Sequence, residues 1–253
     1  MTWSVPQKYF DLHPIERITL PPVKKGDLDD IPAFGKKLAK EVYDPSNGRN
    51  FAVKPNGDHE NVMANKQWRK AIQAYLATIS FADTQIGRVL DALDRSRHAD
   101  NTIVVLWGDH GWHLGEHAIW GKHALFEESL HSPLIIHYKD LPQAGMATQA
   151  MVETLDVFPT LCDLAGLPKP GYLHGVSLLP LLKDPKEKGH VAIGYRRSNR
   201  TIRTDTHRLI LHGDGFAELY DHTTKAGETR NVAKKHPELV KSLTEQMAKR
   251  LSR

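Results

Sequence analysis

The sequence predicts an α/β fold: a mainly parallel sheet with flanking helices, followed by a small antiparallel sheet with one helix. Two β-branched runs, residues 103–107 and 134–138, lack polar alternation and therefore predict strands buried on both faces, as in parallel sheets. A long helical pattern precedes the first run and a short one follows the second, and such alternation is typical of parallel sheets. After residue 190, short strand-like runs separated by hairpin-type turns predict the antiparallel part.

The first 60 residues are rich in Pro, Gly, Asp and Asn and predict an irregular lead-in with one short helix near residues 34–42. Because so long an irregular stretch is uncommon inside a compact domain, we expect it to wrap over a core supplied by another segment. A helix is expected over residues 65–93, where apolar side chains recur at helical spacing. A second is expected over residues 156–166, with Asp156 as its cap and Gly166 at its end.

A charged linker at residues 183–189 predicts two domains, residues 1–186 and 187–253. The first is expected to hold the α/β part and the second a small α+β subdomain closed by a helix from Pro237 to about residue 251. The strands expected in the second domain are residues 191–195, 201–203, 208–211 and 217–220.

Composition excludes several classes of protein. With 40% hydrophobic and 25% charged residues, the 253-residue chain is not mostly disordered. No apolar run approaches the roughly 18 residues that a membrane-spanning helix needs, and no signal peptide is visible. A single cysteine, Cys162, excludes an intrachain disulfide. The net charge of +4 is spread along the chain without a basic stripe interleaved with aromatic residues, so no nucleic-acid partner is predicted.

The segment from residue 107 to residue 123 carries the candidate chemistry. Asp109 and His110 directly follow a predicted strand, and ligands of open α/β sheets bind at the ends of strands. A carboxylate beside an imidazole is a plausible half of a metal site, and the neighbouring glycines let the backbone approach a ligand closely. Lys122 offers a positive charge for an anionic substrate.

Plainer interpretations of the same residues remain open. Asp-His-Gly after a strand is also a common turn, a lone lysine is usually solvated, and His113, His117 and His123 are more often loop histidines than ligands. The pattern His-Leu-Gly-Glu-His at 113–117 matches a zinc-peptidase motif, but that motif needs a helix, and Gly115 in its middle favours a loop.

A family resemblance follows from these motifs. Residues 103–122, with Gly-Asp-His-Gly-Trp-x-Leu-Gly-Glu-His and then Trp-Gly-Lys, resemble the second metal-binding segment of the sulfatase family, most closely its iduronate-2-sulfatase-like members. The resemblance continues through residues 131–136, 154–168, 174–182, 200–205, 218–222 and 228–231. Lys225 and Ala226 depart from the family's usual Asp-Pro, which affects the shape of a loop and not the chemistry.

The resemblance implies an alkaline-phosphatase-like fold and hydrolysis of sulfate esters, with a sulfated carbohydrate as substrate. It also implies a formylglycine nucleophile, made from the Cys or Ser of a C/S-x-P-S-R motif, and a Ca²⁺ ion, a hard cation that prefers oxygen ligands. Asp109 would then bind Ca²⁺, His110 would lie beside the metal and the nucleophile, and Lys122 would bind the sulfate or the leaving-group oxygen. Further substrate contacts are expected from His123, Arg200, Arg203 and His174, for which a surface role is the plainer alternative.

The resemblance also implies what lies outside this sequence. The chain has no C/S-x-P-S-R motif, and Cys162 lies in an apolar helix, where it is expected to pack in the core. Asp29 and Asp30 follow no buried strand, so they do not match the family's N-terminal metal pair. We therefore expect the C-terminal half of a sulfatase, with the missing N-terminal half as partner, and little activity from this chain alone. Because family members are mostly exported or lysosomal, the resemblance suggests a periplasmic, extracellular or lysosomal protein.

Two other functions stay open. A phosphodiesterase or phosphonate hydrolase of the same superfamily also places Asp-His at its metal and differs in nucleophile and metal. A catalytically inactive chain that binds sulfated glycans would retain binding to heparin or carrageenan without turnover.

Overall fold

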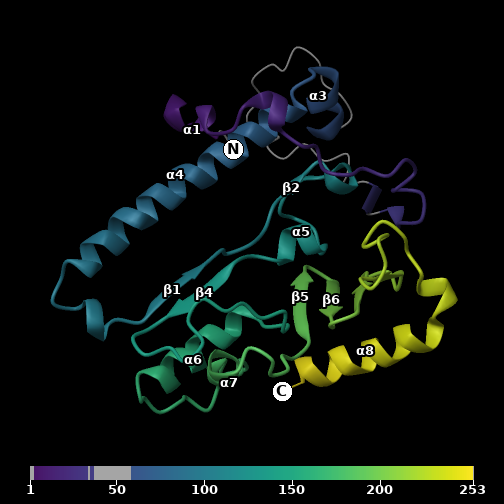
Figure 1. Ribbon diagram of the computed structural model, residues 1–253. Helices are drawn as coiled ribbons and strands as arrows, with labels where there is room; N and C mark the ends of the chain where they lie inside the picture. Colours follow the sequence, from purple (N-terminus) through teal and green to yellow (C-terminus); the bar gives the residue numbers. More distant parts are fainter. Residues whose placement is uncertain (1–2, 34, 37–57, 253) are drawn as a thin grey trace. The chain divides into compact units, whose positions relative to one another are not determined.

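The computed structural model describes residues 3–33, 35–36 and 58–252 (Figure 1). The chain divides into two compact units. The first comprises Met1–Asp100 and Trp112–Lys122, and the second comprises Asn101–Gly111 and His123–Arg253. The predicted domain boundary at residue 186 falls inside the second unit and stays a prediction. The helix expected near residues 34–42 lies almost wholly outside the described residues. Among those described, no helix is long and apolar enough to cross a bilayer.

Helix α4 (Trp68–Asp94) is the main element of the first unit, and it confirms the helix expected over residues 65–93. The unit also contains α1 (Gln7–Asp11), η1 (Ile15–Arg17) and α3 (Asp58–Ala64). Helix α1 packs along α4, where the ring of Tyr9 meets that of Phe81 edge-on at 5.3 Å. Only part of the apolar stripe of α4 is covered, because Ile72 is buried whereas Ile79 and Val89 are exposed.

The loop of residues 112–122 completes the first unit. Strand β2 (His113–Leu114) pairs antiparallel with β3 (Trp120–Gly121), and η4 (Glu116–Ala118) lies between them. Gly115 has a φ of +116°, and a Cβ there would lie 2.8 Å from the ring of Trp68, so this position requires glycine. His113 and His117 therefore do not share a continuous helix, which confirms the expected loop and removes the basis of the zinc-peptidase interpretation.

In the second unit, β1 (Val104–Trp107) and β4 (Leu134–His137) form both predicted strands of the α/β part. They pair antiparallel, with Leu106 opposite Ile135, so the mainly parallel sheet expected for this region is not found among the described residues. Nor are they buried on both faces, since Trp107 is 50% and Ile135 56% exposed. A β-branched run favours a strand but does not determine the direction of its partner or what covers it.

Short helices follow these strands. Helix α5 (Glu127–Leu130) lies in the connection from β1 to β4, and η5 (Thr154–Asp156), α6 (Val157–Leu164) and α7 (Leu179–Lys183) come after β4. The helix expected over residues 156–166 is confirmed as α6, and Gly166 follows it with a φ of +66°. Cys162 is buried in α6, in agreement with its expected packing role.

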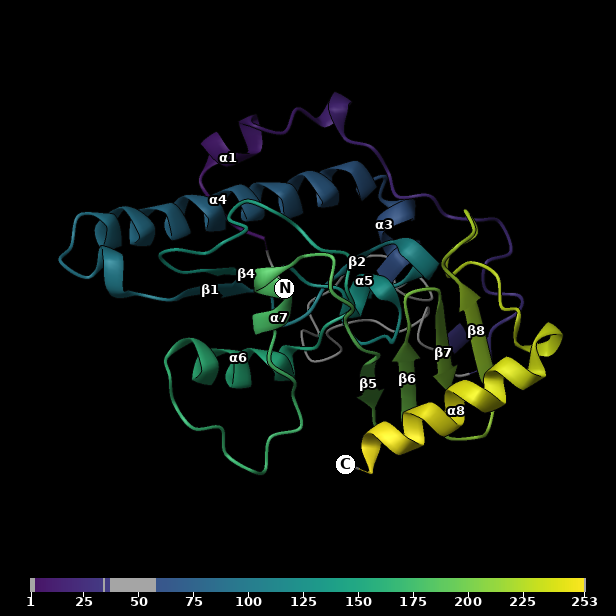
Figure 2. The ribbon, with the colours of Figure 1, turned by 60° about the horizontal axis from the view of Figure 1, so that its bottom comes forward.

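The C-terminal part is the predicted antiparallel sheet with one helix (Figure 2). Its strands lie in the order β5 (Ala192–Arg196), β6 (Asn199–Arg203), β7 (His207–Leu211) and β8 (Ala217–Asp221). Helix α8 (Pro237–Leu251), preceded by η6 (Ala233–Lys235), covers one face. Between that face and α8 lies the apolar core, made of Ile202, Leu209, Leu219, Ala233, Leu243 and Met247.

The opposite face of this sheet carries several buried polar side chains beside the buried Ile210 and Tyr220. Side chains alternate along a strand, so the residues next to the apolar core positions point away from α8. They include Thr201, Arg203, Arg208 and Glu218, all of which are buried. Buried charges need partners, and the partners of the two arginines form part of the candidate site.

Candidate functional site

Asp109 and His110 lie side by side just beyond the end of β1. His110 Nε2 is 3.2 Å from Asp109 Oδ2, and the Asp109 side chain is 81% exposed. His110 Nδ1 lies 2.8 Å from the carbonyl oxygen of Gly111 and must donate to it, because a carbonyl can only accept. His110 Nε2 and Asp109 Oδ2 thus place a nitrogen and an oxygen ligand atom side by side.

The backbone on each side of this pair is held by residues 129–133. The Gly108 amide donates to Pro133 O at 2.9 Å, and the Ser132 hydroxyl donates to Gly108 O at 2.8 Å. The Gly111 amide donates to Ser129 O at 2.9 Å. A Cβ at position 111 would lie 2.0 Å from Glu128 O, so only glycine permits this approach.

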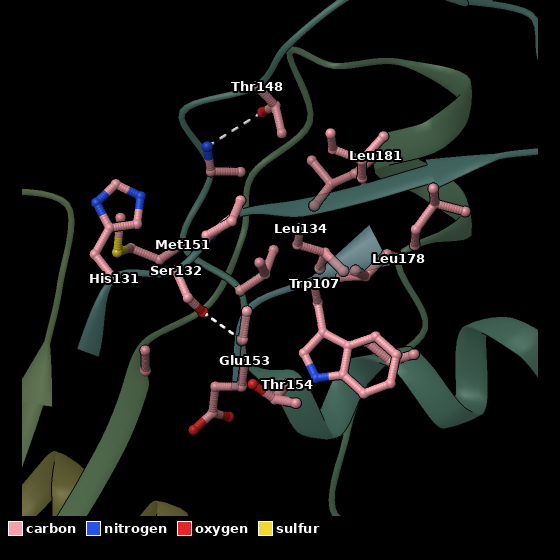
Figure 3. A pocket seen from close by; sticks show the side chains of 18 of the residues that line it. Trp107, His131, Ser132, Leu134, Thr148, Met151, Glu153, Thr154, Leu178 and Leu181 are labelled. Atoms are coloured by element: carbon pink, nitrogen blue, oxygen red, sulfur yellow. Dashed lines mark hydrogen bonds between the residues drawn. The ribbon is translucent and has the colours of Figure 1, made fainter. Parts of the chain in front are cut away.

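A cavity of about 720 Å³ adjoins the pair in the second unit. Figure 3 shows Leu134, Leu178 and Leu181 on one side of this cavity and His131 on the other. Its titratable lining consists of Asp109, His110, Glu127, His131, His137, Glu153, Arg203 and Arg208. A ligand there would meet both apolar and polar side chains, the composition that binding pockets commonly have.

Two arginines that line the cavity belong to a buried ion cluster. Arg203 Nε lies 3.2 Å from Glu127 Oε2, and Arg208 bonds both Glu127 and Glu228. His222 joins them, because Nε2 donates to Glu228 at 3.0 Å and Nδ1 accepts from Arg203 at 3.1 Å. Arg203 therefore already has carboxylate and imidazole partners inside the protein. The sequence offered no spacing that would have revealed this cluster.

Glu228 is the most strongly perturbed carboxyl group of the cluster. Burial by itself raises its pKa, but the charge of Arg208 and hydrogen bonds from His222 and the Glu127 amide outweigh burial and lower the pKa to about 2. The pKa of Glu127 is also lowered, since Arg208 and Arg203 outweigh the effect of burial. Both carboxylates are therefore ionised at neutral pH.

A second buried cluster surrounds Asp156. Its carboxylate does not cap α6 as expected; it accepts from the Glu153 and Val176 amides, each at 2.7 Å, and from His190 Nε2 at 2.8 Å. Glu153 bonds Arg250 Nη2 at 2.6 Å. The hydrogen bond to Asp156 outweighs partial burial and raises the pKa of His190.

Each cluster contains three groups that could ligate a metal ion: Glu127, His222 and Glu228 in one, Glu153, Asp156 and His190 in the other. Arginine already supplies the counter-charge in both. No such group among the described residues includes Asp109.

The other predicted site residues are dispersed. Lys122 is half-buried at the end of the first unit, whereas Asp109 and His110 belong to the second, so their joint action stays a prediction. Arg200 is exposed opposite Tyr195, and its side chain leaves the sheet on the face opposite that of Arg203. The exposed side chains of His123, His174 and Arg200 do not line the cavity.

Comparison with known proteins identifies the family of this chain. The family model "Sulfatase" matches residues 34–167, and the model "N-sulphoglucosamine sulphohydrolase, C-terminal" matches residues 115–253. A sulfatase of Formosa agariphila is 40% identical over 231 residues, which cover 90% of this chain and 43% of that protein. Human iduronate 2-sulfatase is 35% identical over 191 residues, covering 65% of this chain and 34% of the human protein.

Solved structures agree. The structure of BT4656 in complex with its substrate D-glucosamine-2-N,6-O-disulfate matches with a TM-score of 0.67 at 31% identity, over 75% of this chain and 43% of that one. The phosphonate monoester hydrolase SpPMH from Silicibacter pomeroyi matches with a TM-score of 0.79 at 25% identity, over 96% of this chain and 52% of that one. The chain thus spans less than half the length of the curated relatives named above. On these matches, the chain belongs to the sulfatase family.

Proposed function

We propose that this chain carries part of the active site of a hydrolase that cleaves sulfate esters of sugars. The observation that carries the proposal is the contact of 3.2 Å between His110 Nε2 and Asp109 Oδ2 beside a cavity with charged lining. The pair would hold one side of a Ca²⁺ ion, which when bound withdraws charge from the sulfate oxygens. Lys122 would bind the sulfate or the leaving-group oxygen.

The donor set fits Ca²⁺ only in part. Asp109 supplies one exposed carboxylate, whereas Ca²⁺ takes about six to eight oxygen ligands. We propose that an N-terminal segment of the family supplies the remaining ligands together with the formylglycine nucleophile, for which the 253 residues contain no C/S-x-P-S-R motif. Exposed apolar side chains on β1 and β4, those of Trp107 and Ile135, offer that segment a surface to pack on.

The relatives support a sulfated sugar as the substrate class. BT4656 was solved with a disulfated glucosamine, and an N-acetylglucosamine-6-O-sulfatase of Bacteroides thetaiotaomicron is 29% identical over 238 residues. We retain Lys122 and His123 as proposed substrate contacts and Arg200 as an outer one. Arg203 is assigned a supporting role, because its guanidinium is bound to Glu127 and His222.

Phosphonate or phosphodiester hydrolysis is the second candidate, favoured by the likeness to SpPMH. The experiment that separates the candidates mixes the purified chain with an N-terminal half from the Formosa relative that contains formylglycine. Hydrolysis of an aryl sulfate by the mixture, and not by either part alone, is expected. Preference for a phenyl phosphonate would favour the second candidate, and hydrolysis by this chain alone would overturn the proposed division of the site.

The matched variants are Asp109→Asn and Asp205→Asn. Asp109→Asn should abolish hydrolysis by the mixture, whereas Asp205→Asn replaces an exposed aspartate elsewhere and should leave the rate unchanged. Micromolar heparin binding by the isolated chain, with no turnover in any mixture, would favour a glycan-binding protein instead.

A further inference from the structure

We infer that Glu228 is a positioning residue for the Asp109–His110 pair and acts on it through helix α5. This inference rests on the proposed function, which gives the pair its role. The two sites are far apart in sequence, but every link between them lies within the second unit.

The first link joins Glu228 to the start of α5. The N-cap residue of this helix, Phe126, makes no side-chain capping bond. Instead, Glu228 Oε2 accepts from the Glu127 amide at 2.7 Å, across 101 residues of sequence. A negatively charged acceptor at a helix N-terminus satisfies a backbone donor that the helix itself leaves unbonded. Glu228 therefore caps α5 from a distant segment.

The second link fixes Glu228 itself. Its other oxygen, Oε1, bonds Arg208 of β7 and accepts from His222 Nε2 at 3.0 Å. Arg208 in turn bonds the carboxylate of Glu127, so one guanidinium connects the cap to the first side chain of α5. The Glu228 side chain is only 4% exposed, and charge-assisted bonds with little access to water are strong and directional.

The third link joins α5 to the pair. Ser129 of α5 accepts the Gly111 amide, while Ser132 and Pro133, just beyond α5, bond the carbonyl and the amide of Gly108. Asp109 and His110 thus lie between two glycines whose backbone bonds end on one short segment. If that segment loses its cap, both glycine anchors loosen together and the orientation of Asp109 toward His110 changes.

The test measures amide hydrogen exchange in the full chain. In Glu228→Gln, exchange at Gly108 and Gly111 should rise about ten- to a hundredfold relative to the amides of α8, the range expected for losing a charge-assisted bond. Glu228→Asp keeps the charge beside Arg208 but withdraws it from the Glu127 amide. Glu228→Asp should therefore give the same rise in amide exchange at Gly108 and Gly111. This second variant allows the test to be made even if Glu228→Gln does not fold.

The matched control is Glu153→Gln. Glu153 is also a buried carboxylate that bonds an arginine and a backbone amide, that of Ile193, but no bond connects it to α5. This variant should raise the amide exchange rate of Ile193. The exchange rates of Gly108 and Gly111, relative to those of the α8 amides, should stay as in the wild type. The inference would be overturned if the relative exchange rates of Gly108 and Gly111 were unchanged in both Glu228 variants. It would also be overturned if these rates rose equally in Glu153→Gln, which would indicate a general stabilising role.

A Ca²⁺ titration of the wild-type chain mixed with the N-terminal half, followed through the NMR signals of Asp109 and His110, separates this inference from the proposed function. Signals that do not respond to Ca²⁺ contradict the metal site. The exchange pattern in the variants still decides whether Glu228 positions the pair.

Discussion

Replacing the Glu228 carboxylate tests the energetics of the buried ion cluster. The folded-state pKa is lowered from 4.5 to about 2, so Glu228 stabilises the fold fully above pH 4.5 and loses this contribution as pH falls toward 2. At about 1.4 kcal/mol per pH unit, the difference corresponds to ~3 kcal/mol at neutral pH. Removing one partner of a buried pair has a similar cost, because it leaves Arg208 with less counter-charge.

The assay compares wild-type protein with Glu228→Gln in urea unfolding followed by circular dichroism between pH 7 and pH 2.5. Glutamine does not titrate, so the variant should be less stable by ~3 kcal/mol at pH 7, and the gap should shrink steadily below pH 4.5. Glu187→Gln, which changes an exposed glutamate, should show no gap at any pH. A gap between wild type and Glu228→Gln that stays constant from pH 7 to pH 2.5 would refute the reasoning.

Three further predictions concern other parts of the fold. His190 has a raised pKa, so it stabilises the fold fully below pH 6.5 and loses that effect as pH rises through its folded-state pKa. Between pH 6 and pH 9, the free energy of unfolding measured in urea should therefore fall more for the wild type than for His190→Gln. Gly111→Ala should lower the free energy of unfolding by roughly 1–3 kcal/mol, because the added Cβ would clash with Glu128 O. Gly87→Ala on α4 has open space around its Cβ and should raise the free energy of unfolding by about 1 kcal/mol. Equal effects of the two variants in thermal unfolding would contradict the close contact at Gly111. Leu219→Ala removes a fully buried side chain and should cost roughly 2–5 kcal/mol, while Leu167→Ala, 61% exposed, should be near neutral in the same assay.

The fold could be predicted where local signals agree. Helix α8 has the predicted bounds because Pro237 starts it and an amphipathic pattern continues to Leu251. The antiparallel strands followed from short runs separated by turns. The mainly parallel sheet is not confirmed among the described residues, where β4 pairs antiparallel with β1. The direction of one strand relative to the other depends on the path of the chain between them, which neither run encodes.

The candidate site could be predicted only in part. Asp109 and His110 are adjacent in sequence, so a strand end was enough to bring them together. The cluster around Arg208 joins residues 20 and 81 positions away, and no local spacing reports such contacts. Arg200 and Arg203 were expected to act alike, but their positions three residues apart on one strand direct them to opposite faces.

The most direct test of the central claim is a crystal of this chain in complex with the N-terminal half, soaked in millimolar Mn²⁺ as a probe for a divalent cation site with oxygen ligands. The account predicts an anomalous peak within coordination distance of Asp109 Oδ2 and next to His110, and its loss in Asp109→Asn. A crystal in which the carboxylate and the imidazole keep their direct contact, with no peak between them at saturating Mn²⁺, would contradict it.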